Sequence, residues 1–552
     1  NENLKKIFHS KYFFSVIAIL FITIFCFAMT PVTLQNDTFY TIKIGEQITQ
    51  TGIDMQDHFS WHEDLAYTYP HWLYDLATYE IYANFGMDGI YIVTCILSAI
   101  LGISLYIVNT KITKNQITSF ILTALVIYVI RDYIAARAQL VTFILFVWII
   151  YFIEMFLKNK KIRYAIGLVI ISTLIANLHV AVWPFIFVLF LPYIAEYILS
   201  VLSEMAIYRK LKIAILKIKI NRLAKTGKNE NKKIALEEEL QQIINKNQKI
   251  KIKREEDLKN AYKIRFIKNS NVKWLILIMI ICAFTGLLTP LGDTPYTYLY
   301  KTMEGNTTQN INEHLPMTIA DETEALTAIV LVLGILMFTK TKIQLSDLFM
   351  ISGLCYLMLA TKRQMTMFCI IGVFILNKMI CEFIEGYTKG QKIQFNHVTR
   401  GIGYVIMITV MLGASYHFYE PKQDDEYIST SDYPVQACDY ILENIDVSSA
   451  RFYNEYNYGS YLIYRGIPVF IDSRADLYAP EFSGKEEDIF TDFINTSSIG
   501  TFYEDTFEKY DITHVITYKN SKVNMIIIET KDPHYKKLYD DKYFIVYERL
   551  NV

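Results

Sequence analysis

Long apolar runs alternate with short polar segments over residues 1–420 of the chain. Eleven of these runs meet or approach the roughly 20 apolar residues that a spanning helix needs: 12–34, 88–108, 115–131, 138–157, 163–177, 180–204, 273–291, 323–339, 344–361, 365–385 and 400–417. The pattern therefore predicts a polytopic α-helical membrane protein with about 11 spans. Residues 421–552 instead alternate short apolar runs with turns, which predicts a small α/β domain.

Composition agrees with this prediction, since 53% of the 552 residues are hydrophobic. The net charge of -1 gives no reason to expect a nucleic-acid partner. The seven cysteines show neither a disulfide framework nor the spacing of a zinc site.

Basic residues occupy every second gap between the predicted spans. They are Lys111 and Lys114, the segments 158–163, 205–272 and 389–400, and Lys340 with Lys342. Because positive loops stay in the cytoplasm, the N-terminus is expected there. A transmembrane domain of residues 1–420 then carries a first extracytoplasmic loop at 31–87, and residues 421–552 form an extracytoplasmic domain.

The insertion at 205–272 is a charged, helical, cytosolic segment in this topology. Leu236, Leu240, Ile243 and Ile244 recur on one helix face among Glu and Lys neighbours. A hairpin that binds a partner or anionic lipid is one interpretation. A solvated helical pair is the favoured one.

The first extracytoplasmic loop holds the first candidate for chemistry. Asp37 follows directly on the first span, and an ionisable group at the membrane surface is a functional hypothesis by default. Asn36, Asp37 and Thr38 also suit the N-cap of a surface helix that runs to about Gln50. The motif PHWLYD starts a second surface helix, in which His71 suits an architectural role more than a catalytic one.

Several basic side chains lie on the outer side of this topology, against the usual bias. Arg137, Arg363 and His179 are candidates for binding a phosphate, which a guanidinium matches with two parallel hydrogen bonds. Anionic headgroups or acidic neighbours such as Asp132 are the alternative partners. Glu313, in the motif NEHLPM, is a candidate second carboxylate or acceptor contact. The alternative interpretation is an exposed acidic residue of a loop that has no functional role.

In the C-terminal domain, YPVQACDYILENI is predicted to be helical, and IPVFID, THVITY and YFIVYERL to be strands. Between them lies a cluster of Asp472, Arg474 and Asp476. This cluster is interpreted either as an acceptor-binding site or as a turn held by local ion pairs.

The sequence contains no Gly-rich phosphate loop, Walker lysine, dinucleotide fingerprint or nucleophile elbow in a supporting context. A cytosolic nucleotide site is therefore not expected. If the chain is an enzyme, its activated substrate is expected to arrive through the lipid.

These features resemble the GT-C superfamily of integral-membrane glycosyltransferases, in particular the bacterial lipid A aminoarabinose and protein mannosyltransferase type. The segments that carry the resemblance are NDTFYTIKIGEQITQTGIDMQDHFSW, HWLYDL, ARAQLVTFILF, NLHVAVWPF, NEHLPM, TKRQMTMF and GSYLIYRGIPVFIDSRADLY. The resemblance implies that Asp37 is the catalytic carboxylate and that the donor is a sugar on a polyprenyl phosphate. Asn36-Asp37 stands where many members have Asp-x-Asp, so Mg²⁺ or Mn²⁺ is left open as a cofactor.

The implied reaction moves the sugar to an extracytoplasmic glycan, lipid or protein acceptor. Asp37 takes the acceptor's proton, while Arg137, Arg363 and His179 stabilise the departing phosphate. Glu313 and His71 are further candidates for contacts with the acceptor. A transporter or flippase of lipid-linked glycans, and a non-catalytic membrane subunit of a glycan assembly complex, are the alternative functions.

Overall fold

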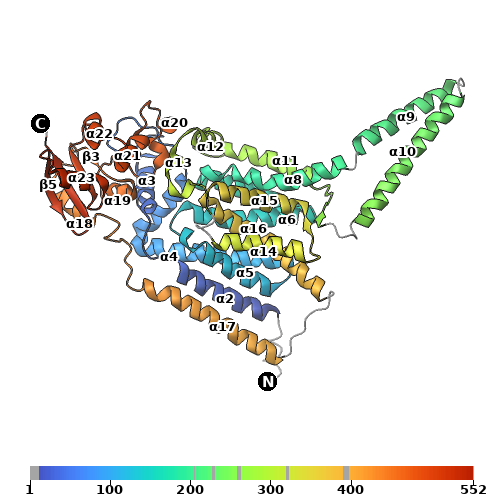
Figure 1. Ribbon diagram of the computed structural model, residues 1–552, viewed down its shortest axis with the longest axis horizontal. Helices are drawn as coiled ribbons and strands as arrows, with labels where there is room; N and C mark the ends of the chain where they lie inside the picture. Colours follow the sequence, from blue (N-terminus) through green and yellow to red (C-terminus); the bar gives the residue numbers. More distant parts are fainter. Residues whose placement is uncertain are drawn as a thin grey trace.

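The computed structural model of the chain describes residues 11–203, 206–226, 230–257, 263–318, 323–388 and 397–550. Figure 1 shows three parts in line: the C-terminal domain, a bundle of long helices lying side by side, and a helical hairpin at the far end. The predicted cytoplasmic residues 1–10, the basic loop segment 389–396 and parts of the predicted insertion (205, 227–229 and 258–262) lie outside the described residues.

The bundle consists of helices that coincide with the eleven predicted apolar ranges. They are α2 (Lys11–Met29), α4 (Trp72–Thr113), α5 (Gln116–Val129), α6 (Ala138–Asn159), α7 (Ile162–Leu178), α8 (Phe185–Ser203), α11 (Val272–Phe284), α14 (Thr323–Phe338), α15 (Leu345–Ala360), α16 (Met365–Tyr387) and α17 (His397–Tyr419). Among the described helices, six are long and apolar enough to cross a membrane, and five shorter apolar helices accompany them. The prediction of a multi-pass helical membrane protein is confirmed, while the number of crossings stays a prediction.

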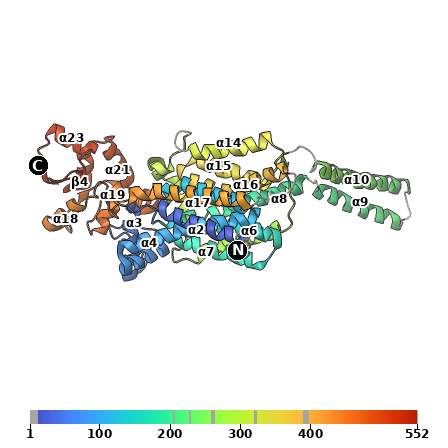
Figure 2. The ribbon, with the colours of Figure 1, turned by 90° about the horizontal axis from the view of Figure 1, so that it is seen from below.

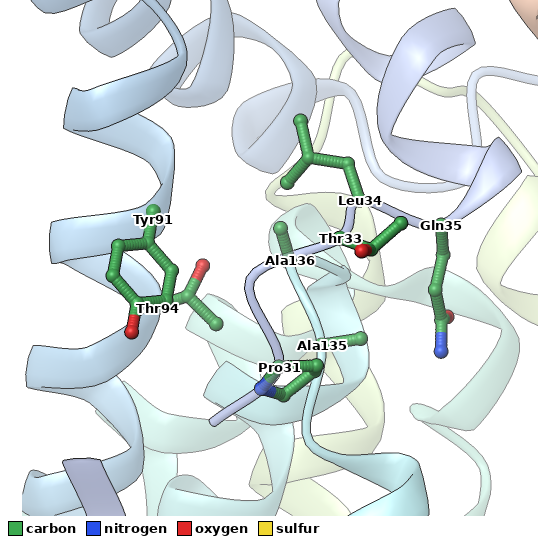
Figure 3. A pocket seen from close by; sticks show the side chains of 8 residues that line it. All are labelled: Pro31, Thr33, Leu34, Gln35, Tyr91, Thr94, Ala135 and Ala136. Atoms are coloured by element: carbon green, nitrogen blue, oxygen red, sulfur yellow. The ribbon is translucent and has the colours of Figure 1, made fainter. Parts of the chain in front are cut away.

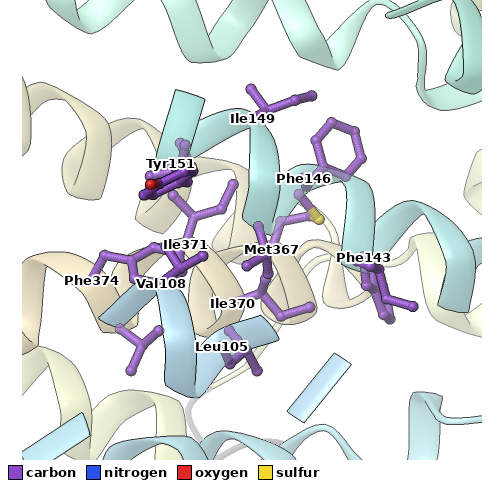
Figure 4. Close-up of a cluster of buried hydrophobic side chains, with 14 of the residues drawn as sticks. Leu105, Val108, Phe143, Phe146, Ile149, Tyr151, Met367, Ile370, Ile371 and Phe374 are labelled. Carbon is purple, nitrogen blue, oxygen red and sulfur yellow. The ribbon is translucent and has the colours of Figure 1, made fainter. Parts of the chain in front are cut away.

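The bundle is apolar inside and outside. Leu105 of α4, Phe146 of α6 and Ile370 of α16 meet in its buried centre (Figure 4). On α7, Ile162 and Ile166 are exposed one helical turn apart. A helix that is hydrophobic on both faces is typical of a protein surrounded by lipid.

Helix α3 (Asn36–Thr51) lies at the end of the bundle that carries the C-terminal domain. The predicted helix is confirmed, but the predicted cap is wrong: Gln35 is the N-cap residue, without a side-chain cap bond. The side chains of Asn36 and Thr38 are used elsewhere. Asn36 Nδ2 donates to Tyr456 O at 3.0 Å, and Thr38 Oγ1 donates to Ala136 O at 3.1 Å.

The second predicted surface helix begins at Trp72 and continues into the second span as α4. The two parts meet at a kink at Gly86, where φ is 64°, a conformation that favours glycine. Helix α3 packs closely on the first part of α4 at Gly45. A side chain there would not fit, because its Cβ would lie 2.2 Å from Asp75 O.

The C-terminal domain contains a four-stranded sheet in the order β3-β4-β6-β5. Its strands are β3 (Phe452–Tyr453), β4 (His514–Tyr518), β5 (Tyr535–Asp540) and β6 (Phe544–Arg549), of which only β3 and β4 pair in parallel. The helices around it are α18 (Val435–Asn444), α19 (Tyr456–Tyr464), α20 (Pro480–Ser483), α21 (Ile489–Ser498), α22 (Tyr503–Lys509) and α23 (Lys522–Thr530). The helix predicted at YPVQACDYILENI and the strands at THVITY and YFIVYERL are confirmed.

The strand predicted at IPVFID is wrong. Residues 467–472 make one isolated bridge, between Val469 and Ser60 of the first loop, and belong to no strand. The first loop covers this segment. His62 Nε2 lies 2.9 Å from Phe470 O, and Trp61 Nε1 donates to Phe452 O at 2.9 Å.

A buried ion triad joins the first loop to the C-terminal domain. Arg474 binds Asp57 at 2.6 Å and Asp472 at 2.8 Å, and all three side chains are at most 1% exposed. Burial favours a higher pKa for the Asp57 carboxyl, but the Arg474 charge and hydrogen bonds from Ser60 lower it below its ordinary value. The predicted local pair of Arg474 with Asp472 is present, while Asp476 binds Tyr298 and Thr307 instead.

Helices α9 (Ala206–Thr226) and α10 (Glu230–Asp257) form the hairpin, and Lys212 pairs with Glu239 across it at 2.8 Å. In both views the hairpin projects away from the bundle, opposite the C-terminal domain (Figures 1 and 2). The predicted helical pair is therefore present. At its base, β1 (Ile264–Arg265) pairs in parallel with β2 (Ile343–Gln344).

Short helical segments complete the bundle's connections. They are η1 (Arg131–Tyr133), η2 (Val180–Val182), η3 (Thr285–Leu287), α12 (Thr294–Glu304), α13 (Thr307–Asn310), η4 (Asn312–His314), η5 (Lys362–Gln364) and η6 (Glu420–Lys422); η7 (Ala475–Tyr478) lies in the C-terminal domain. Two candidate site residues lie in these segments, Glu313 in η4 and Arg363 in η5, and His179 immediately precedes η2.

Replacing Arg474 with Ala is expected to destabilise the protein by about 3–5 kcal/mol, because two buried carboxylates lose their partner. Thermal unfolding in detergent and protease cleavage of residues 52–66 measure the loss. Lys536→Ala is the control, since Lys536 pairs with Glu548 at the surface, where such a pair is worth about 0–1 kcal/mol. Equal melting temperatures for the two variants would contradict the role of the triad.

Candidate active site between the helix bundle and the C-terminal domain

An ion pair joins Asp37, in the first turn of α3, to Arg137, at the start of α6. Arg137 Nη2 lies 2.6 Å from Asp37 Oδ2, and the two side chains are 21% and 20% exposed. Asp37 is in the first turn of α3, where the positive helix end favours a carboxylate, and Arg137 is the N-cap residue of α6. The structure thus brings together two residues that are 100 positions apart in the sequence.

Glu313 binds the same arginine from η4. Its Oε1 lies 3.4 Å from Arg137 Nη1, so the guanidinium contacts both carboxylates. Burial favours a lower pKa for Arg137, but the charges of Asp37 and then Glu313 outweigh this effect and raise it. Arg137 is therefore a permanent cation in this site.

Arg363 of η5 lies beside this group. Its Nη2 donates to Gln139 Oε1 at 3.0 Å, and the charges of Arg137, Glu313 and Asp37 all act on it. Two guanidinium groups therefore lie next to two carboxylates at one end of the bundle. A phosphate would find hydrogen-bond donors here with a fixed planar geometry.

His179 lies close to the same arginines, immediately before η2. It is 7% exposed, and its Nδ1 has no hydrogen-bond partner among the described residues. Burial, followed by the charges of Arg363, His71 and Arg137, lowers the pKa of His179 well below its ordinary value. The imidazole is neutral, so it can offer a hydrogen bond to a ligand but no positive charge.

His71 also reaches this region, where its ring lies 6.0 Å from the ring of His179. It hydrogen-bonds to Tyr40 and to the buried Asp75, two residues that the sequence analysis did not assign to the site. The spacing of Tyr40 and Asp75 from candidate site residues could have indicated this in the sequence. Tyr40 follows Asp37 by three positions and Asp75 follows His71 by four, which places each pair on one helix face.

Asp476 is a further partly buried acid, and its hydrogen-bond partners lie outside the predicted cluster of Asp472, Arg474 and Asp476. It accepts hydrogen bonds from the Tyr298 hydroxyl and from Thr307 Oγ1, the latter at 3.2 Å. Burial is the main cause that raises the pKa of the Asp476 carboxyl. These contacts join the C-terminal domain to α12 and α13, close to the charged group.

A small pocket opens beside the backbone that leads to Asp37 and Arg137 (Figure 3). Its lining is Pro31, Thr33, Leu34, Gln35, Tyr91, Thr94, Ala135 and Ala136. The pocket contains no charged side chain, in contrast to the neighbouring ion pairs. Uncharged and charged surfaces therefore lie next to each other at this end of the bundle.

The residues of this site do not fit a divalent cation. Among the described residues, no group of three or more His, Cys, Asp or Glu side chains could hold a metal ion. The two nearest carboxylates, of Asp37 and Glu313, are already bridged by a guanidinium. A cation between them would meet the positive charge of Arg137.

No family model and no curated protein sequence matches the chain. Solved structures do. The oligosaccharyltransferase AglB from Archaeoglobus fulgidus, in complex with an inhibitory peptide and a dolichol-phosphate, matches with a TM-score of 0.54 and 10% identity, over 92% of this chain and 70% of that one. The apo form of the oligosaccharyltransferase from that organism matches with a TM-score of 0.53 and 11% identity, over 98% of this chain and 75% of that one.

ArnT from Cupriavidus metallidurans, bound to undecaprenyl phosphate, matches with a TM-score of 0.50 and 8% identity, over 97% of both chains. AglB and ArnT are membrane glycosyltransferases of the GT-C superfamily. The likeness to them shows that this chain has the GT-C fold, which confirms the fold that the sequence resemblance implied.

Replacing Arg137 with Ala is expected to raise the affinity of the site for Mn²⁺, because it removes the cation between two carboxylates. Electron paramagnetic resonance of added Mn²⁺ measures the bound fraction, which should be small in the wild type and larger in the variant. Arg131→Ala is the control, since Arg131 pairs with Asp132 near the same end of the bundle. Strong Mn²⁺ binding by the wild type would contradict the conclusion that Arg137 keeps a divalent cation out of this site.

Proposed function

We propose that the chain is a glycosyltransferase that moves a sugar from a polyprenyl phosphate to an acceptor at the extracytoplasmic face of the membrane. The observation that carries the proposal is the ion pair of Asp37 with Arg137 at the end of a GT-C bundle. It places a carboxylate next to phosphate-binding groups. The C-terminal domain lies on the same end, so this end is the extracytoplasmic one in the topology that the basic loops predict.

The donor's chemistry suits the two kinds of surface in this region. A polyprenyl-phosphate sugar carries a charged phosphate next to a hydrocarbon chain. Arg137 and Arg363 suit the phosphate, and the apolar outer surface of the helix bundle suits the hydrocarbon chain. The AglB structure in complex with a dolichol-phosphate and the ArnT structure bound to undecaprenyl phosphate support such a donor.

In the proposed reaction Asp37 takes the proton from a hydroxyl or amide of the acceptor. The freed oxygen or nitrogen forms a bond to the anomeric carbon, and the bond from that carbon to the phosphate oxygen breaks. The electron pair stays on the phosphate, which leaves with one additional negative charge. Arg137 and Arg363 stabilise this charge, and His179 adds a neutral hydrogen bond.

Arg137 can keep its bond to Asp37 during this step, because a guanidinium has five N–H donors. A single displacement of this kind inverts the anomeric carbon. Glu313 lies on the far side of Arg137 as an acceptor contact in this arrangement. If Glu313 were a nucleophile, two displacements would retain the configuration.

Replacing Asp37 with Asn should lower sugar transfer by about 10²-fold or more, the usual effect of losing a general base. The assay supplies undecaprenyl phosphate carrying [14C]mannose, galactose or arabinose, adds solubilised membrane extract as the source of acceptor, and follows the loss of label from the organic phase. Binding of undecaprenyl phosphate should be unchanged, because the arginines remain.

Asp132→Asn is the matched control, since Asp132 is an exposed carboxylate next to Arg131 at the same end of the bundle. It should keep the wild-type rate. Sugar release by Asp37→Asn at the wild-type rate would contradict the catalytic role. A wild type that binds undecaprenyl phosphate but leaves all three sugars on the lipid would favour transport or assembly.

A further inference from the structure

A chain of hydrogen bonds leads from the candidate site into the protein. The Tyr40 hydroxyl lies 3.2 Å from Nε2 of His71, and Nδ1 of His71 lies 2.8 Å from Oδ1 of Asp75. Asp75 is fully buried, and the His71 side chain is 14% exposed. The three residues come from two helices, α3 and α4, and the loop residue that precedes α4.

The direction of these bonds follows from their chemistry. In its ionised form the Asp75 carboxylate can only accept, so His71 then carries its proton on Nδ1 and donates it to Asp75. The lone pair of Nε2 then accepts from the Tyr40 hydroxyl. A carboxylate that holds an imidazole in one tautomer also stabilises the imidazolium that forms when Nε2 gains a proton.

The Tyr40 end of the chain lies next to the carboxylate of the proposed reaction. Tyr40 follows Asp37 by three positions on α3, so the two side chains are neighbours on the helix surface. Burial and then the charge of Asp37 raise the pKa of the Tyr40 hydroxyl well above its ordinary value. Tyr40 is therefore a neutral hydroxyl, which can accept one proton while it donates another.

Other charged and titratable groups surround this chain on every side that packs against it. They are Asp37, Arg137, Tyr67, His179 and Arg474. Asp75 is the carboxylate that contacts His71 directly. Asp75 is therefore the group positioned to stabilise an imidazolium at His71.

We propose that Tyr40, His71 and Asp75 form a proton outlet for the transfer site. This inference rests on the proposed function. After the acceptor's proton has moved to Asp37, a bridging water carries it to the Tyr40 oxygen, because the described contacts include no direct hydrogen bond between these two side chains. The Tyr40 hydroxyl proton then passes to Nε2 of His71. Asp75 stabilises the imidazolium, which releases the proton to water at its exposed edge, so one proton leaves per sugar transferred and no redox partner takes part.

The chain contains a second His–Asp pair that serves as a matched control. His58 Nε2 lies 2.6 Å from Asp54 Oδ2 with the same spacing of four positions, but the two side chains are 40% and 38% exposed. The His58–Asp54 pair and the His71–Asp75 pair share residue types and loop region. They differ in burial and in the contact with Tyr40.

The test compares His71→Gln, Tyr40→Phe and Asp75→Asn with His58→Gln and Asp54→Asn. The rate of label release from the undecaprenyl-phosphate sugar that the wild type turns over is measured against pH. His71→Gln should lower kcat by about 10²-fold and leave the KM for the donor unchanged. Tyr40→Phe should also lower kcat, and the two variants of the control pair should match the wild type.

Two measurements separate a proton outlet from a structural role. Melting temperatures show whether a variant is folded, and Tyr40→Phe remains informative if the buried Asp75→Asn does not fold. Added imidazole should restore part of the rate of His71→Ala, because it replaces the proton acceptor and not a packing contact.

The failure of this inference differs from the failure of the proposed function. If Asp37→Asn is inactive while His71→Gln and Tyr40→Phe keep the wild-type rate and pH profile, the outlet is wrong and the transferase stands. If a folded His71→Ala gains nothing from imidazole, the outlet is also wrong. If the wild type itself releases no sugar, both proposals fall.

Discussion

The contact between Asp37 and Arg137 is the interaction on which the rest of the structure depends. It is a short ion pair, at 2.6 Å, between the first turn of a surface helix and the start of a membrane helix. Both side chains are about one-fifth exposed, so neither charge is fully screened by water and each needs the other. The pair also holds a carboxylate and a guanidinium together at the end of the helix bundle, where the proposed function places a lipid-borne phosphate.

The surrounding fold keeps α3 in place from three directions. Gly45 lets α3 approach the backbone of α4, Thr38 binds the segment before α6, and Asn36 binds the C-terminal domain at Tyr456. The first loop is joined to that domain a second time, through the buried triad of Arg474. The C-terminal domain therefore helps to hold α3 and the first loop in position.

Much of this architecture could be predicted from the sequence, because spanning helices have a strong local signal. The apolar ranges, α3, and the strands β4 and β6 follow from periodicity and length. The cap of α3 and the strand at IPVFID were wrong, since Asn36, Thr38 and the 467–472 segment find their partners in distant parts of the chain. Local patterns do not contain such contacts.

The same limit applies to the site. Asp37, Arg137, Arg363, His179, Glu313 and His71 were each selected by residue type and expected position, and the structure places them in one region. Their mutual geometry was not predictable. In particular, the bridging of Asp37 and Glu313 by Arg137 depends on η4, which follows α6 by more than 150 residues. Asp75 and Tyr40 looked like ordinary helix residues until their contacts with His71 were seen.

The most direct measurement is an electron-microscopy density map of the detergent-solubilised protein with added undecaprenyl phosphate. We expect the phosphate to lie at the C-terminal-domain end of the bundle, within hydrogen-bond distance of Arg137 or Arg363 and on the side that faces Asp37. A phosphate found at the middle of the bundle, or at the end that carries the α9–α10 hairpin, would contradict the assignment of this ion pair as the centre of sugar transfer.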